Sequence, residues 1–231
     1  MTASAAWTDA AVAALSPLAC ARNATAMRSY MKDVAPFLGV KTPERRRALR
    51  SAWAGLAPLD PAGVSDAARG LWALPEREYQ YAACDLLAKE ARRLPGEFVA
   101  DPVESLLTDR PWWDTVDALG TAAITPLVHR HPDLVDLTWA WLDSGDRWLI
   151  RAAIQHQRGL KQATDLPRLF AMCDRFAGDR EFFIAKAIGW ALRDVTRWDP
   201  AAVQRFVDEH PRLSPVARRE AARGLSRSAR P

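Results

Sequence analysis

One short run of the sequence places aromatic and acidic side chains at a spacing that suits chemistry. The run WWDTVD occupies positions 112–117 and follows a proline. On a helix starting near Trp112, Trp113 and Asp117 are four residues apart and share a face. Asp114 falls in the first turn, where a carboxylate suits the helix dipole, so we expect a helix-start residue there. Taken alone, the residues favour a surface or salt-bridged carboxylate for Asp117, with a catalytic carboxylate as the alternative.

Two further runs carry basic side chains among apolar ones. Arg151 lies among small and apolar residues in the run 146–153; it is either the partner of a buried acid or a clamp for a phosphate, and both remain open. In the run 181–193, Lys186, Trp190 and Arg193 lie along one helix face, although core packing is the usual fate of a helix tryptophan. Gly189 interrupts this helix at a cost of about 1 kcal/mol relative to alanine. That cost indicates the close approach of a neighbouring helix or of a ligand backbone.

The basic residues fit a nucleic-acid partner. The formal net charge is +4, and five of the 32 basic residues are lysines, the others being arginines. Arginine binds phosphate oxygens through two parallel hydrogen bonds, although a GC-rich genome also favours arginine over lysine. Arg193, one turn beyond Trp190, is our first choice for a phosphate contact. The other candidates are Arg45, Arg46, Arg47, Arg158, Arg197, Arg218, Arg219 and Arg223.

Metal, cofactor and membrane chemistry find little support in the sequence. The cysteines Cys20, Cys84 and Cys173 are far apart, so we expect reduced, buried thiols. Histidine and cysteine do not occur at metal-ligand spacing, and we expect neither a metal nor a cofactor. The first twenty residues lack a basic start and contain Asp9, which predicts an amphipathic helix rather than a leader. No stretch is apolar enough to cross a membrane, so we expect a cytoplasmic, nucleoid-associated protein.

The periodicity along the chain is helical. Apolar residues recur three and four positions apart, and proline interrupts the pattern every 12 to 20 residues. Several prolines follow a capping residue, as expected at the first position of a helix: Thr42-Pro43, Asp60-Pro61, Asp101-Pro102, Asp199-Pro200 and Ser214-Pro215. The predicted fold is therefore all-α, a curved solenoid of antiparallel helix pairs in a single domain over residues 1–231. A compact helical bundle is the alternative, and a short basic tail is expected from about residue 226.

Six runs in a fixed order resemble one known family. The chain is similar to the bacterial DNA alkylation repair family of HEAT-like-repeat DNA glycosylases, the AlkD type. The resemblance covers nearly the whole chain and rests on these runs, with Tyr30-Met31-Lys32 preceding them: 37–46 (FLGVKTPERR), 77–80 (REYQ), 112–117 (WWDTVD), 148–154 (WLIRAAI), 182–190 (FFIAKAIGW) and 213–221, which holds Leu213-Ser214-Pro215 and Arg219-Glu220-Ala221.

The resemblance implies a role for each candidate site residue. Asp117 occupies the position of the catalytic aspartate, and Trp113 and Trp190 are the aromatic walls beside the lesion. Arg151 grips the DNA backbone near the lesion, and Tyr30 matches a tyrosine near the cleft. Further expected DNA-binding residues are Phe182, Lys186 and Arg193.

The implied substrates are purines alkylated at N3 or N7 in duplex DNA, as in 3-methyladenine and 7-methylguanine. Such a base carries a positive charge and leaves without a general acid, so one carboxylate that stabilises the developing sugar cation and orients water is enough. Lysines are absent between Lys89 and Lys161, and only Lys186 lies near the candidate site. We therefore expect a monofunctional glycosylase acting as a monomer, rather than a lyase with an amine nucleophile. The alternatives are a non-catalytic repeat protein that binds damaged or unusual DNA, and a protein–protein scaffold.

Overall fold

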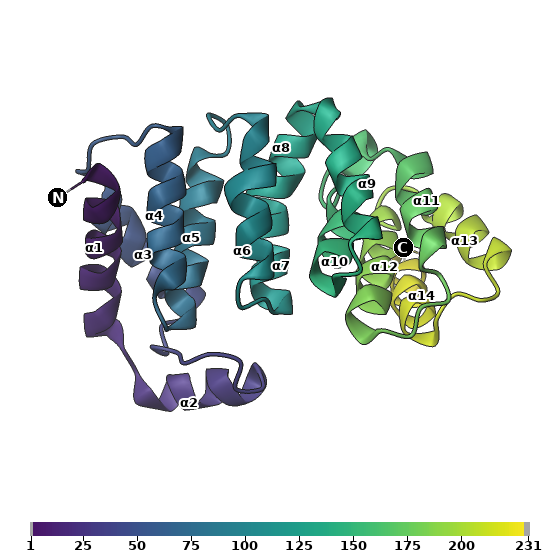
Figure 1. Cartoon of the computed structure of the whole chain (residues 1–231). Coiled ribbons are helices and arrows are strands. Elements are labelled where there is room, and N and C mark those ends of the chain that lie inside the picture. The colour runs from purple at the N-terminus through teal and green to yellow at the C-terminus, as the bar shows by residue number, and fades with distance from the viewer. Residues whose placement is uncertain (1, 229–231) are drawn as a thin grey trace. The chain divides into compact units, whose positions relative to one another are not determined.

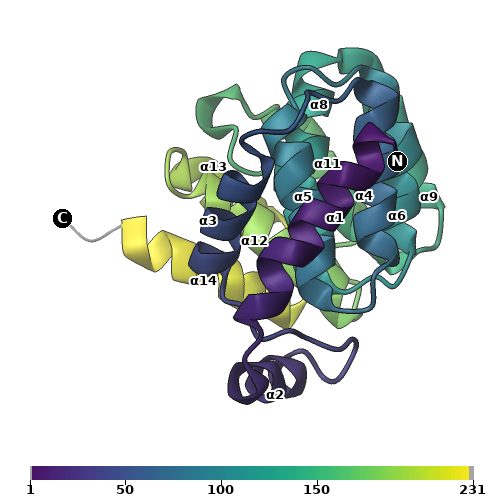
Figure 2. The same cartoon turned by 90° about the vertical axis from the view of Figure 1, so that its left-hand side faces the viewer.

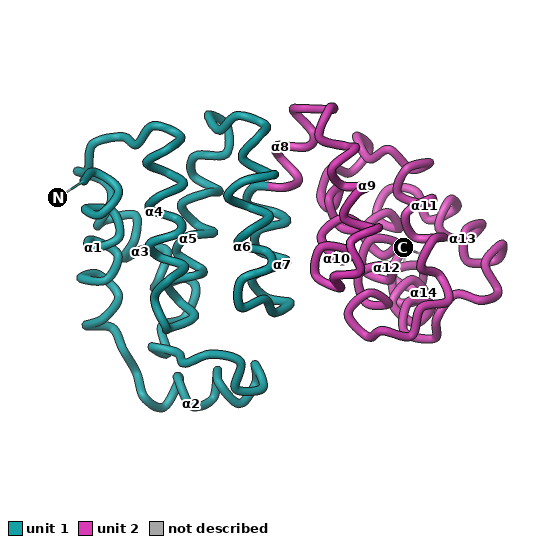
Figure 3. Tube along the Cα trace, viewed as in Figure 1, with its two compact units in different colours: residues 1–123 teal, residues 124–231 magenta. Residues whose placement is uncertain are grey.

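The chain folds into two compact helical units. The computed structural model describes residues 2–228, and all regular secondary structure in this range is helical (Figure 1). The units are Met1–Ala123 and Ile124–Pro231 (Figure 3). The all-α class expected from the periodicity is therefore confirmed.

The first unit contains seven α-helices in the described residues. The α-helices are α1 (Ala3–Leu15), α2 (Ala21–Tyr30), α3 (Thr42–Trp53), α4 (Pro61–Ala73), α5 (Arg77–Glu90), α6 (Glu104–Thr108) and α7 (Trp113–Leu119). The short segments are η1 (Ser16–Leu18), η2 (Gly96–Phe98) and η3 (Val99–Val103), and η4 (Gly120–Ile124) leads into the second unit. Helices α4 and α5 pack as an antiparallel pair because only three residues join them.

The second unit repeats this pattern of short paired helices. Its α-helices are α8 (Thr125–Arg130), α9 (Val135–Asp143), α10 (Arg147–Gln155), α11 (Leu166–Arg175), α12 (Phe182–Val195), α13 (Pro200–Glu209) and α14 (Pro215–Ser228). The short segments are η5 (Pro132–Leu134) and η6 (Lys161–Ala163). Helices α9 and α10 form an antiparallel pair, and α12 packs along α14. Helix α14 continues to Ser228, so the tail expected from about residue 226 is helical at first, and residues 229–231 lie outside the described part.

Most of the proline-marked helix starts are confirmed. The carboxylates of Asp60 and Asp199 accept hydrogen bonds from the amides of Gly63 and Ala202, which caps α4 and α13. Ser214 Oγ accepts from the amide of Ala217 at 3.3 Å at the start of α14. Each of these side chains satisfies an amide that has no partner within the helix.

At the other two positions the expected cap is absent, although α3 does begin at the Thr42-Pro43 step. Helix α3 already includes Thr42, and its flanking residue Lys41 makes no side-chain cap; the Thr42 hydroxyl instead accepts from Arg45 at 3.4 Å. Asp101 has non-helical backbone angles within η3, and its carboxylate pairs with Arg69. Asp101 is thus engaged by a tertiary partner, whereas the partner of Thr42 lies one turn along the same helix.

Helix α2 differs from its neighbours because none of its residues is buried. In Figures 1 and 2, α1, α3, α4 and α5 lie side by side, while α2 lies apart from them at the lower edge. Burial in the core therefore contributes little to the position of α2.

Apolar side chains fill the inside of each unit. Leu71, Trp72 and Leu87 are buried in the first unit, and Ile154, Met172 and Leu192 in the second. The thiols of Cys84 and Cys173 are buried as expected, whereas Cys20 is partly exposed. Within residues 2–228, no helix is long and apolar enough to cross a membrane, and no group of side chains has the composition of a metal site.

Candidate functional site

The candidate residues of the first unit meet around helix α7. This helix begins at Trp113, so Trp113 and Asp117 share a face as the spacing predicts. Both residues are half-buried. The ring of Tyr30, at the end of α2, contacts the Trp113 ring edge-on, with 6.2 Å between the ring centroids. The Tyr30 side chain is 69% exposed, although large aromatic side chains are usually more deeply buried.

A pocket of about 490 Å³ adjoins this aromatic pair. Tyr30, Trp113 and Asp114 are among the residues that line it, and its wall is otherwise largely apolar. Asp117 is not among the lining residues. The other lining residues are Ala26, Met27, Met31, Phe37, Thr42, Arg45, Arg46, Tyr81 and Ala118.

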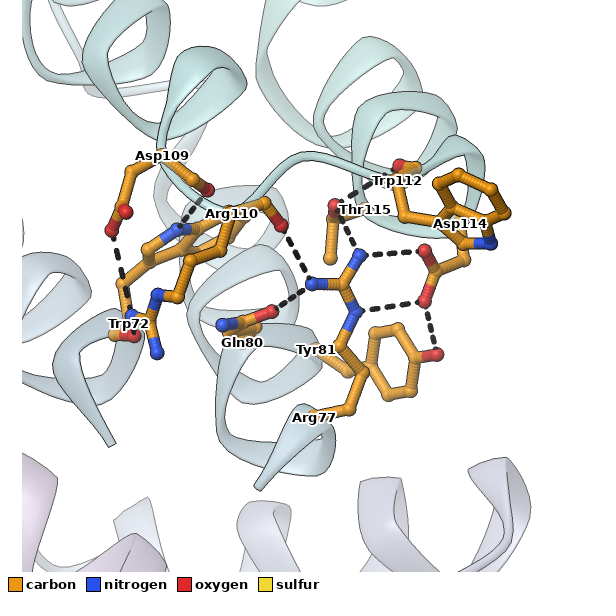
Figure 4. A network of polar contacts seen from close by, with 9 residues as sticks. All are labelled: Trp72, Arg77, Gln80, Tyr81, Asp109, Arg110, Trp112, Asp114 and Thr115. Atoms are coloured by element: carbon orange, nitrogen blue, oxygen red, sulfur yellow. Dashed lines mark hydrogen bonds and ion pairs between the residues drawn. The ribbon is translucent and has the colours of Figure 1, made fainter. Parts of the chain in front are cut away.

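Asp114 is more than the helix-start residue that the sequence predicts. Its carboxylate forms a two-pronged ion pair with Arg77, with Nη2–Oδ1 and Nε–Oδ2 distances of 2.7 and 3.0 Å, and it accepts a hydrogen bond from the Tyr81 hydroxyl (Figure 4). Burial raises the pKa of Tyr81, and the charge of Asp114 raises it further. Tyr81 therefore stays a neutral phenol that donates to Asp114.

Arg77 is fully buried, yet each of its five N–H groups has an acceptor. Besides the two bonds to Asp114, Nη2 donates to the Thr115 hydroxyl at 2.9 Å, and Nη1 donates to the backbone oxygen of Arg110 at 3.0 Å and to Gln80 (Figure 4). One α5 side chain thus holds both the start of α7 and the loop before it. A buried charge is tolerated only with this degree of pairing.

The candidate residues of the second unit gather around Trp190. The guanidinium carbons of Arg151, Arg158 and Arg193 lie 5.2, 5.2 and 5.7 Å from its ring centroid, and Lys186 Nζ lies at 6.0 Å. These distances permit cation–π attraction. Arg151 is buried and donates to the backbone oxygen of Phe183 at 2.8 Å. The sequence placed two of these basic residues, Lys186 and Arg193, along one helix face with Trp190, but it did not foresee that Arg151 and Arg158 would also lie against the ring.

Glu220 of α14 holds two of the expected DNA-binding residues. Its carboxylate accepts from Lys186 at 2.8 Å, from Arg193 at 2.6 Å and from Arg223 at 2.8 Å, although Glu220 itself is only 2% exposed. Burial alone would raise the pKa of Glu220, but the hydrogen bond from Lys186 and the three positive charges lower it below its ordinary value. Lys186 thus donates directly to a buried carboxylate.

The close approach expected at Gly189 is that of a neighbouring helix. A Cβ atom at Gly189 would lie 2.6 Å from Glu220 Cβ and 3.1 Å from Ala217 Cα. The glycine therefore lets α12 and α14 touch, which brings Glu220 within reach of Lys186 and Arg193.

Phe182 and a basic pocket complete the second-unit group. Phe182 is 53% exposed at the first position of α12, where its ring meets Phe183 edge-on at 5.3 Å. A pocket of about 330 Å³ adjoins Trp190, and four arginines line it together with Asp194. These arginines are Arg158, Arg193, Arg197 and Arg227. The sequence named the first three as phosphate candidates but not Arg227, which it assigned to the tail.

The polar partners missed by sequence reasoning are Arg77, Glu78, Tyr81 and Glu220. Arg77 and Glu78 belong to the run REYQ at 77–80, and Glu220 belongs to the run that closes the chain. Both runs contributed to the family resemblance, but the sequence alone gave no physical reason why these residues occur there. Charged residues within otherwise apolar helical faces were the available signal.

Comparisons with known proteins agree on one family. The family model described as DNA alkylation repair enzyme matches residues 11–225. A solved structure described as a predicted DNA alkylation repair enzyme from Enterococcus faecalis is 29% identical, with a TM-score of 0.82 over 89% of this chain and 96% of that one. No curated protein matches the sequence. With a family model that spans nearly the whole sequence, the chain belongs to the DNA alkylation repair enzyme family.

Proposed function

We propose that this protein is a monofunctional DNA glycosylase that hydrolyses the N-glycosidic bond of cationic N3- or N7-alkylated purines in duplex DNA. The observation that carries the proposal is helix α7, which presents Asp117 on the same face as Trp113, with Tyr30 against the tryptophan ring. A carboxylate beside aromatic rings suits a reaction in which positive charge moves from a base onto a sugar. Membership of the DNA alkylation repair enzyme family supports the same substrate class.

Asp117 carries the chemical step in this proposal. Departure of the base gives an oxocarbenium-like sugar, which a nearby carboxylate stabilises while it orients the attacking water. The alkylated base is already cationic and leaves as a neutral purine, so no second carboxyl group is needed as an acid. Trp113 attracts the cationic nucleotide through its ring face, with a contribution of about 0.5–2 kcal/mol.

The second unit supplies basic groups for the DNA backbone. Arg151, Lys186 and Arg193 lie around Trp190, and Phe182 is exposed one turn before Lys186. The Lys186 amine donates a hydrogen bond to Glu220, and this contact holds it away from attack on a sugar aldehyde. This supports hydrolysis without a lyase step, and borohydride is expected to trap no DNA adduct.

Base release from a duplex containing 7-methylguanine tests the proposal. We expect the wild-type protein to release the base in single-turnover reactions, and Asp117→Asn to lower the rate at least about 100-fold because the carboxylate charge is lost. Asp66→Asn, which changes an exposed carboxylate on α4, is the matched control and should retain the wild-type rate. Salt-dependent duplex binding without base release by the wild type would instead indicate a non-catalytic DNA-binding protein.

A further inference from the structure

Two consecutive residues at the start of α5 are buried charges whose partners lie on opposite sides of the first-unit site. Arg77 and Glu78 are each 0% exposed. Arg77 bonds to the start of α7, whereas Glu78 bonds to the loop that follows α2. A fully buried charge costs several kcal/mol of desolvation unless it is well paired, so two in succession indicate a specific structural task.

Glu78 holds the loop 38–40 through three backbone amides. Its Oε2 accepts from the amide of Leu38 at 2.9 Å, and Oε1 accepts from the amides of Gly39 and Val40 at 2.8 and 3.0 Å. The preceding segment is also attached to α5, because the amide of Arg77 donates to the backbone oxygen of Pro36 at 2.9 Å. The first turn of α5 therefore fixes the chain that leaves α2.

The same loop fixes the beginning of α2. The amide of Cys20 donates to Leu38 O at 2.8 Å, and Asn23 Nδ2 donates to Gly39 O at 3.2 Å. Gly39 has φ +88°, and a Cβ atom there would lie 2.2 Å from Cys20 O, so only glycine allows this approach. Since α2 buries none of its own residues, these bonds set where its last residue, Tyr30, lies.

Arg77 performs the corresponding task for α7. Its two bonds to Asp114 and its bond to Thr115 secure the first turn of the helix, next to Trp113, and Asp117 follows one turn later. Tyr81, one turn along α5, adds a hydrogen bond to Asp114. The two residues at the start of α5 thus reach, through different partners, the two rings that touch at the pocket.

We propose that Arg77 and Glu78 are positioning residues that set the two sides of the site from one turn of α5: Arg77 orients Trp113 and Asp117 through Asp114, and Glu78 orients Tyr30 through the loop 38–40. The inference rests on the proposed function, since the groups being positioned are those of the glycosylase site. Neither residue touches DNA in this role. Misplacement by about 1 Å of groups that act on a transition state costs on the order of 100-fold in rate.

A comparison of rate and binding separates positioning from general stability. Glu78→Gln and Tyr81→Phe, the latter a mild change in the Arg77 network, are each expected to lower the single-turnover rate about 10- to 100-fold. Affinity for an undamaged duplex should stay within about threefold, because the bulk of DNA affinity comes from phosphate contacts. Glu90→Gln removes a buried charge at the other end of α5 and should leave the rate unchanged. Equal losses of rate and affinity, or an equal loss in Glu90→Gln, would overturn the inference.

A double-mutant comparison assigns each residue to its own side of the site. If Glu78 acts through Tyr30, Glu78→Gln should lower the rate little further in a Tyr30→Ala background, whereas Tyr81→Phe should keep its full effect there. If Glu78→Gln lowers the rate by the same factor in the Tyr30→Ala background as in the wild type, the assignment is contradicted. Should Glu78→Gln fail to fold, Asn23→Ala tests the same path through the Gly39 bond.

Amide hydrogen exchange gives a readout that does not depend on activity. Glu78→Gln should speed exchange in residues 21–40 and leave 110–119 as in the wild type, and Tyr81→Phe should do the reverse. If the wild type releases no alkylpurine, the proposed function fails while the exchange pattern still decides whether α5 fixes the two segments separately. Faster exchange throughout the first unit in both variants would contradict the inference.

Discussion

Single charged residues decide much of how this protein places its functional groups. Arg77, Glu78 and Glu220 are nearly or fully buried, and each binds at least three separate groups. Glu220 draws together Lys186 and Arg193, whose charges would otherwise repel one another beside Trp190. One acidic side chain therefore holds three of the basic groups of the second unit.

Glu220 makes stability depend on pH in a predictable way. Its folded-state pKa lies below the ordinary value of about 4.3, so its contribution to stability is present above that pH and is lost as pH falls through the folded-state value. Glu220→Gln is expected to lower the free energy of unfolding at pH 7 by about 2–3 kcal/mol, since partners of a buried charge are left unpaired. Urea unfolding at a series of pH values checks this.

The difference in unfolding free energy between wild type and Glu220→Gln should narrow as the pH falls below the ordinary glutamate pKa of about 4.3 toward the lower folded-state value. Glu209→Gln, at an exposed position on α13, is the control and should follow the wild-type curve at every pH. A gap of constant size from pH 7 to pH 3 would contradict the role assigned to the Glu220 charge.

Local sequence patterns predicted where these residues lie on their helices. They could not predict partners that are distant in the sequence. The four-residue spacing placed Trp113 and Asp117 on one helix face, and the position of Asp114 identified a first turn. The partners of Asp114, however, lie 33 and 37 residues earlier in the chain, at Tyr81 and Arg77. Short-range periodicity contains no information about such pairs, so the network that positions α7 emerges only in three dimensions.

At the scale of elements, close contact between α12 and α14 creates the setting of Glu220. The sequence identified Gly189 as a place of close approach but left open whether a helix or a ligand comes near; the structure shows α14 there. The helices themselves were predictable because proline and capping residues mark their starts. Which helices touch each other was not predictable, because the sequence carries no recurring consensus that fixes the pairing.

Gly189→Ala is expected to destabilise the second unit by about 1–3 kcal/mol, because the added methyl group would force α12 and α14 apart. Thermal unfolding followed by circular dichroism measures the loss. Gly55→Ala is the control, since a Cβ atom at Gly55 meets nothing within 4 Å and its change should stay within about 0.5 kcal/mol. A Gly189→Ala variant that is more stable than the wild type would contradict this prediction, because α12 and α14 would then accommodate the added methyl group.

At the scale of the whole molecule, the chemical groups are divided between two compact units. Asp117, Trp113 and Tyr30 belong to the first unit, and Arg151, Trp190 and the arginine-lined pocket belong to the second. The proposed chemistry is concentrated in one unit and the basic side chains around Trp190 in the other. Duplex binding and base release are therefore expected to respond to different substitutions.

Arg197→Ala tests that division through the salt dependence of duplex binding. Arg197 is exposed at the arginine-lined pocket, and loss of one phosphate contact should reduce the slope of log affinity against log salt by about 1. Arg205→Ala, exposed on α13 beside Asp174 and Glu209, should leave the slope unchanged. Identical slopes for wild type and Arg197→Ala would remove this pocket from the DNA-binding surface.

The burial of two thiols has a consequence for a protein that works during alkylation damage. Electrophiles that methylate purines also attack sulfur, and they do so through the thiolate. Burial raises the pKa of Cys84 and of Cys173, so both stay as thiols inside the packed interior. Alkylating agents therefore find no reactive thiolate at these two positions. We expect both buried cysteines to stay unmodified while the DNA is being alkylated.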